Sequence, residues 1–141
     1  MGGATVASYR ADLPARLALS TQPPRFILSN FGANDVATLP AEATWKADYL
    51  AIIDAFVAKW PLAKVLVTRP WRRGYGTECN TLASWIADII AARPGVAFAG
   101  DDERVWMENG DNGATMTIDG THYSSAGQLA GAAAKRAALG Y

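Results

Sequence analysis

The alternation of short apolar runs with segments of helical periodicity is the feature that most constrains the fold of this chain. Three runs rich in strand-forming residues occupy positions 25–31 (RFILSNF), 63–68 (AKVLVT) and 95–99 (GVAFA). Apolar runs of this length are typical of strands buried on both faces of a sheet. Because a helical segment lies between each pair, successive strands must be joined by crossovers and run parallel. The pattern predicts a single α/β domain over residues 1–141, with helices covering both faces of a parallel sheet.

The helical segments place apolar side chains three and four residues apart, which is the spacing of one buried helix face. The first is expected to end before Pro61, and the second to run over about 77–93. An alanine-rich helix is expected after Ser124 and Ser125, which are good N-cap residues, and to continue to Gly140. The apolar faces of the first two helices consist of Tyr49, Ile52, Ile53, Phe56, Val57 and Trp60, and of Leu82, Trp85, Ile86, Ile89 and Ile90.

The composition excludes several classes of partner. Thirteen basic and thirteen acidic residues give a formal net charge of zero, so the chain lacks the basic surface of a nucleic-acid or anionic-membrane binder. Its one cysteine, Cys79, belongs to no Cys/His cluster with metal-site spacing, so neither a metal nor a cofactor is expected. No apolar run approaches the roughly 20 residues that span a bilayer, and residues 1–4 lack the features of a signal peptide. The chain is therefore expected to be soluble.

Polar residues follow each predicted strand, where ligands bind in open parallel sheets. His122 is the only histidine, and Asp119 precedes it by three residues across a turn that Gly120 makes possible. A carboxylate at this spacing can accept a hydrogen bond from one imidazole nitrogen and leave the other to act as a base. The alternative is an ordinary Asp-Gly turn before a helix.

The segment after the first strand, Gly32-Ala33-Asn34-Asp35, offers a second polar group. The amide of Asn34 can donate a hydrogen bond to an oxyanion that develops during a reaction. The alternative is a turn whose backbone is capped by Asn34 or Asp35.

These two segments resemble motifs of the SGNH (GDSL-like) hydrolases. The first matches the Gly-x-Asn-Asp block of that family, and residues 119–127 (DGTHYSSAG) match its Asp-x-x-His block. The resemblance implies a three-layer, flavodoxin-like fold and hydrolysis of small-molecule esters, with acetylated carbohydrates among the candidates and no cofactor. It also implies that Asp119 orients His122, the base, and that the oxyanion hole is formed by Asn34 with the backbone of Gly3, or else of Gly2.

The sequence departs from the family pattern at the nucleophile. No Gly-Asp-Ser block occurs, so the first strand and its serine would lie upstream of Met1. Ser8 lies close to the glycine block but is expected in the first turn of a helix, where serine commonly caps. Cys79 is expected to be a small, partly buried side chain.

The loop after the second strand contains Trp71 and Arg72, which together with Gly32 can shape a substrate pocket. A solvated loop is the alternative for this segment.

Three functional hypotheses remain open at this stage. In the first, the chain is an ester hydrolase whose serine is supplied outside the recognised motifs. In the second, it is a catalytically silent fragment or binding module that self-associates. In the third, Asp119 and His122 activate water directly, without a covalent intermediate. Because the first strand would be central in such a sheet, a complementing N-terminal segment or a homo-oligomer is a candidate partner.

Overall fold

The computed structural model describes residues 4–108 and 115–140. In chain order the elements are α1 (Val6–Leu19), β1 (Phe26–Ser29), the 3-10 helix η1 (Val36–Thr38), α2 (Glu42–Lys59), β2 (Lys64–Arg69), α3 (Gly76–Ala91), β3 (Ala97–Asp102), α4 (Glu103–Glu108) and α5 (Ser125–Ala138). All three predicted strands and all three predicted helices are present. The sequence pattern did not predict α1 over its full length, nor α4.

The three strands form one parallel sheet in the order β1-β2-β3. Phe26 pairs with Lys64, and Val65 pairs with Ala97. The register between β2 and β3 shifts by one residue before Arg69, so that β3 runs to Asp102, beyond the predicted end of the strand. The parallel α/β fold is therefore confirmed, and the carboxyl ends of all three strands meet at one edge of the sheet.

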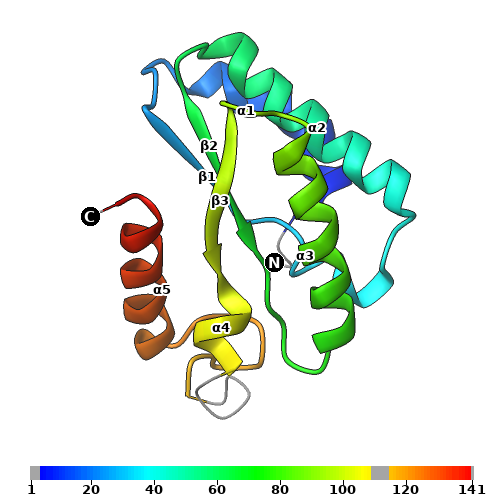
Figure 1. The fold of residues 1–141 in the computed structure, drawn as a ribbon, viewed down its shortest axis with the longest axis vertical. Coiled ribbons are helices and arrows are strands. Elements are labelled where there is room, and N and C mark those ends of the chain that lie inside the picture. The colour runs from blue at the N-terminus through cyan, green and yellow to red at the C-terminus, as the bar shows by residue number, and fades with distance from the viewer. Residues whose placement is uncertain (1–3, 109–114, 141) are drawn as a thin grey trace.

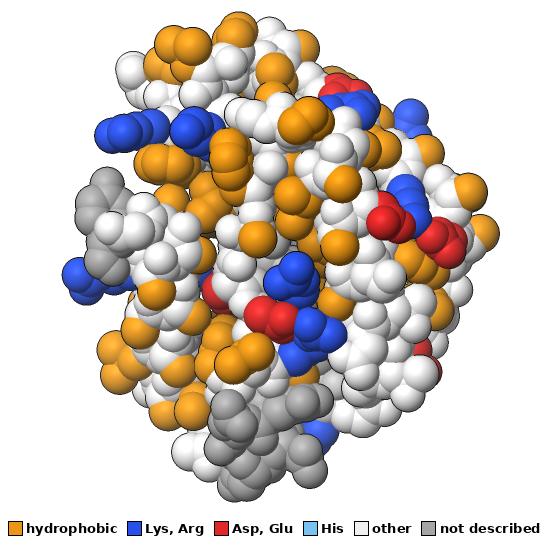
Figure 2. All heavy atoms as spheres, viewed as in Figure 1, with side chains coloured by type: hydrophobic (Ala, Val, Ile, Leu, Met, Phe, Trp, Pro, Cys, Tyr) orange, Lys and Arg blue, Asp and Glu red, His pale blue; other side chains and the backbone are white. Residues whose placement is uncertain are grey.

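The helices are distributed unequally over the two faces of the sheet (Figure 1). The first three helices pack together on one face, where the core contains Tyr49, Ile52 and Ile53 with no exposed surface. Burial of each such side chain contributes about 1.5–3 kcal/mol. On the other face α5 lies beside β3, and Leu28 of β1 and Phe98 of β3 stay 47% and 36% exposed. Hydrophobic side chains are accordingly visible over the strands next to α5 (Figure 2). Among the described residues, the helices on this second face therefore cover less of the sheet than the sequence predicted.

The start of α1 is fixed by two capping interactions. Thr5 is the N-cap residue, and its hydroxyl accepts a hydrogen bond from the backbone N–H of Ser8 at 3.2 Å. Asp35 approaches from the loop after β1, and both of its carboxylate oxygens lie 3.3 Å from the backbone nitrogen of Val6. Because the orphan N–H groups at a helix start need such acceptors, the loop after β1 and the start of α1 are held together.

Candidate active site

A tight turn between Asp119 and His122 brings a carboxylate against an imidazole. Oδ1 of Asp119 accepts hydrogen bonds from the backbone N–H groups of Thr121 and His122 at 3.0 and 2.8 Å. Oδ2 of Asp119 lies 2.7 Å from Nδ1 of His122. These bonds hold the pKa of the Asp119 carboxyl well below its usual range, with the backbone N–H of His122 as the largest cause. An ionised carboxylate only accepts, so Nδ1 of His122 is the nitrogen that donates to it, and in the neutral imidazole Nε2 is an acceptor.

This turn is anchored to the rest of the domain by Arg73, from the loop after β2. The backbone N–H of Arg73 donates to the carbonyl of Gly120 at 3.1 Å, and its guanidinium donates to the hydroxyl of Thr117 at 3.1 Å. Gly120 has a φ of +88°, and a Cβ there would lie 3.2 Å from Cβ of Arg73. The turn therefore needs glycine both for its backbone conformation and for the close approach of the arginine.

The segment after β1 is shaped by a second glycine. Gly32 has a φ of +117°, and a Cβ there would lie 2.7 Å from Cγ of Pro70. The turn directs Asn34 so that its amide nitrogen lies 3.4 Å from the carbonyl oxygen of Ala4. Both predicted backbone donors, Gly3 and Gly2, lie outside the described residues.

Asp35 is a structural residue of this segment. Its side chain is buried and caps α1, and burial raises the pKa of its carboxyl. The expected alternative was that Asp35 caps the backbone of its own turn, whereas the backbone that it caps is the start of α1, 29 residues away in sequence. Asn34 beside it is only partly buried.

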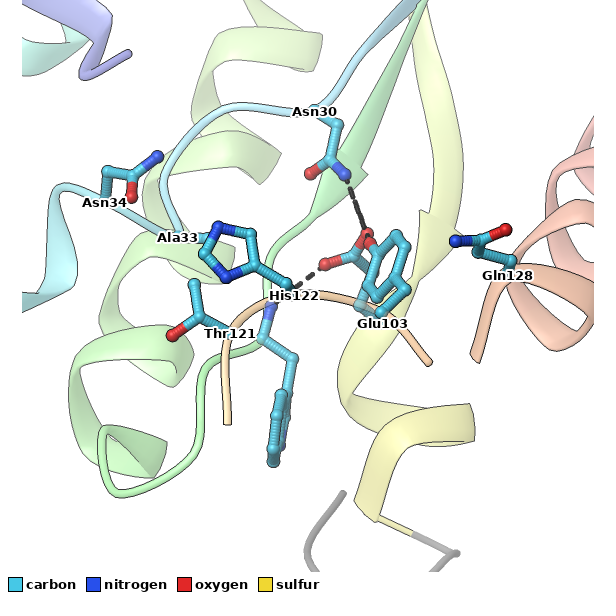
Figure 3. Close-up of a pocket in the computed structure, with 9 residues that line it drawn as sticks. Asn30, Ala33, Asn34, Glu103, Thr121, His122 and Gln128 are labelled. Carbon is cyan, nitrogen blue, oxygen red and sulfur yellow. Dashed lines mark hydrogen bonds between the residues drawn. The ribbon is translucent and has the colours of Figure 1, made fainter. Parts of the chain in front are cut away.

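A pocket of about 390 Å³ lies at the carboxyl edge of the sheet, where these segments meet (Figure 3). It is lined by Asn30, Ala33, Asn34, Trp71, Glu103, Thr121, His122, Tyr123 and Gln128. Asn34 and His122 thus share one pocket although they lie far apart in the sequence, while Asp119 contacts His122 without lining the pocket. Gly32 and Arg72 are not among the described residues that line it.

The loop after β2 connects the segments of the site. Trp71 is only 5% exposed and lines the pocket. Arg72 donates from Nη1 to the carbonyl of Ala33 at 3.2 Å, and its guanidinium lies 5.0 Å from the ring centroid of Tyr75. The solvated-loop alternative is therefore wrong for Trp71 and Arg72, because one is buried and the other is bound to the segment that precedes Asn34.

The sequence did not predict the hydrogen-bond network around one buried carboxylate, that of Glu103. Glu103 is 2% exposed, and its Oε1 accepts hydrogen bonds from Nδ2 of Asn30 at 2.8 Å and from the hydroxyl of Tyr123. Its Oε2 accepts from the backbone N–H of Trp71 at 3.3 Å, and Nζ of Lys135 lies 3.7 Å from Oε1. Burial raises the pKa of the Glu103 carboxyl. One side chain thus joins the ends of all three strands to α5.

The two nucleophile candidates lie away from this pocket. Ser8 is exposed in the first turn of α1, and its hydroxyl donates to the carbonyl of Thr5 at 3.1 Å. Cys79 is fully buried in α3, where burial raises the pKa of its thiol. No serine or cysteine is among the described residues that line the pocket.

Within residues 4–108 and 115–140, no group of three or more His, Cys, Asp or Glu side chains is arranged to hold a metal ion. No helix within these ranges combines the length and apolar character that a membrane span requires.

Comparisons with known proteins agree with the family resemblance of the sequence motifs. A sequence model of the GDSL-like lipase/acylhydrolase family matches residues 1–130. The solved structure "Crystal Structure of TesA" is similar to this chain with a TM-score of 0.74 and 23% identity, over 98% of this chain and 73% of that chain. A search of the curated proteins gave no match. At this identity the structural likeness supports the fold alone.

Proposed function

This chain belongs to the GDSL-like lipase/acylhydrolase family, and from that premise we propose that Asp119 and His122 form the acid–base pair of an ester hydrolase site. Family membership places the chain among ester hydrolases in general. The proposal adds the roles of individual residues: His122 is the base, Asp119 orients it, and Asn34 donates to the oxyanion. The serine nucleophile is supplied outside the recognised motifs.

The contact that carries the proposal is the 2.7 Å approach of Asp119 Oδ2 to His122 Nδ1. The carboxylate is held by two backbone N–H groups of its own turn, so the imidazole is held against a fixed partner. Nε2 of His122 is then the nitrogen that can take a proton from an attacking hydroxyl. This is the arrangement that lets histidine act first as a general base and then as a general acid.

The reaction follows from these positions. A serine hydroxyl attacks the ester carbonyl while Nε2 of His122 takes its proton. The resulting imidazolium is stabilised by Asp119, and it returns the proton to the departing alcohol. Water then repeats the attack on the acyl-enzyme and releases the acid.

Asn34 is suited to stabilise the oxyanion of each tetrahedral intermediate. Its amide nitrogen has two N–H groups, of which one is directed at the carbonyl of Ala4 over a long 3.4 Å. The other can donate to an oxygen in the pocket that Asn34 shares with His122. Removal of one such donor typically costs about 10²- to 10³-fold in rate.

Hydrolysis of p-nitrophenyl acetate tests the assigned roles. We expect turnover to fall about 10²- to 10⁴-fold in His122→Ala and in Asp119→Asn, because the first removes the base and the second removes the acceptor that fixes its tautomer. Asp12→Asn is the matched control, since Asp12 is an exposed carboxylate of α1 that pairs with Arg16. Hydrolysis that survives both site substitutions would contradict the proposal. Intact mass after a fluorophosphonate probe would show whether a serine is labelled, and the labelled peptide would identify it.

A catalytically silent module is the second candidate, and the absence of serine and cysteine from the described pocket lining favours it. It predicts no turnover and no label on the folded chain. It also predicts that Asp119→Asn and His122→Ala leave the behaviour of the chain unchanged.

A further inference from the structure

We propose that Asn30 is a specificity-determining residue that selects esters bearing a hydroxyl group next to the ester, and that Glu103 orients it for this purpose. This inference rests on the proposed function, because it assigns the substrate class of the same pocket. The esters it favours are those of polyhydroxy alcohols. Esters with plain alkyl chains are disfavoured.

The orientation of the Asn30 amide is set by its neighbours. Its Nδ2 donates to Oε1 of Glu103 at 2.8 Å and lies 3.4 Å from the hydroxyl oxygen of Tyr123. Oε1 of Glu103 also accepts from the Tyr123 hydroxyl, and a carboxylate that accepts from a hydroxyl must meet the NH₂ end of an amide. The flipped amide would set two oxygens against each other, so Asn30 is held in one orientation.

The Asn30 carbonyl oxygen is consequently presented to the pocket. Figure 3 shows the nitrogen turned to Glu103 and the oxygen on the side on which Asn34 and His122 lie. Within residues 4–108 and 115–140 no hydrogen bond reaches this oxygen, although Asn30 lines the pocket. It is an acceptor, fixed in direction, beside the group proposed as the base.

A fixed acceptor discriminates between substrates by whether they can donate a hydrogen bond to it. A substrate hydroxyl can donate to Asn30 Oδ1 and replace the water that the site held. An alkyl group at the same place offers this oxygen no donor, so it gains no such hydrogen bond. The amides of Asn34 and Gln128 and the hydroxyl of Thr121 also line the pocket. The pocket therefore suits a hydroxyl-rich ester better than an alkyl chain.

Glycerol monoacetate and propyl acetate test the inference, because they have the same carbon skeleton and differ only in two hydroxyls. Their dissociation constants are measured by NMR titration of the full chain in a His122→Ala background, so that no turnover interferes. We expect glycerol monoacetate to bind more tightly. Asn30→Leu should reduce this preference by about 2- to 10-fold, the usual worth of one hydrogen bond. Asn30→Ala is a second variant in case leucine disturbs the fold.

Asn80→Leu is the matched control, since Asn80 is an exposed asparagine of α3 that accepts from Arg104 outside the pocket. Its preference should equal that of the His122→Ala background. Equal binding of the two esters, binding of neither, or a preference that persists in a folded Asn30 variant would overturn the inference. Because the readout is binding, a preference that depends on Asn30 would stand even if the chain proved to have no hydrolytic activity.

Discussion

Replacement of Glu103 by alanine is the sharpest test of how this site is held together. The substitution removes the acceptor of a buried backbone N–H, that of Trp71, and leaving such a group unsatisfied costs about 1–3 kcal/mol. Lys135 keeps Asp101 as a partner at 3.1 Å, and Asn30 is exposed enough to turn to water, so these two groups add less, about 1 kcal/mol together. We expect the free energy of unfolding to fall by about 2–4 kcal/mol.

Urea unfolding followed by circular dichroism measures this quantity, with the m-value as a check on the compactness of the unfolded state. Glu103→Gln should lose about 1–3 kcal/mol, because its amide oxygen still accepts from Asn30 and Tyr123 but its NH₂ group cannot accept from the backbone N–H of Trp71. Glu42→Ala is the surface control, a helix carboxylate 53% exposed whose loss should cost less than about 1 kcal/mol. If Glu103→Ala costs no more than Glu42→Ala, the reasoning about the buried network is refuted.

Three further substitutions test separate parts of the structure. Gly32→Ala should cost about 1–3 kcal/mol, because its φ of +117° and a proline carbon at 2.7 Å leave no room for Cβ; an unchanged melting temperature would contradict this. Gly127→Ala should also lower the melting temperature, since its Cβ would lie 2.0 Å from the carbonyl oxygen of Met116, and esterase activity should fall with the displaced turn. Asp54→Asn should cost at most about 1 kcal/mol at pH 7, because the ion pair with Arg93 is exposed. Arg93 lowers the pKa of Asp54, so the folded state holds this proton less readily. The difference from the unsubstituted chain should shrink as pH falls below about 4 and vanish below the pKa of the folded state, and urea unfolding at several pH values checks this sign.

The elements and the two motifs were accessible from local sequence, because they depend on near neighbours. Apolar spacing located α2 and α3, and Ser124 caps α5 as expected through a hydrogen bond from the backbone N–H of Gly127 at 3.1 Å. The turn from Asp119 to His122 was predictable for the same reason, since the hydrogen bonds that the Asp119 carboxylate accepts in it span two or three residues.

The contacts that hold the pocket together were not accessible in this way. Glu103 meets Asn30 across 73 residues, and Trp71 across 32. The only local signal was a glutamate directly after a strand, which is also typical of a helix N-terminus. The partly exposed face of the sheet was equally out of reach, because apolar residues such as Leu28 look the same in sequence whether or not a helix covers them.

The attachment of α5 has a consequence for the dynamics of the site. Lys135 on α5 pairs with Asp101 at the end of β3 and with Glu103 at the start of α4, and a Cβ at Gly131 would lie 3.1 Å from the Trp106 ring. The turn that contains His122 leads directly into this helix. Release of α5 would therefore remove one attachment of the His122 turn, in addition to those that Arg73 and Tyr123 provide, without disturbing the core on the opposite face of the sheet. Amide hydrogen exchange should show α5 and the His122 turn opening as one unit, at a lower free energy than α2 and α3.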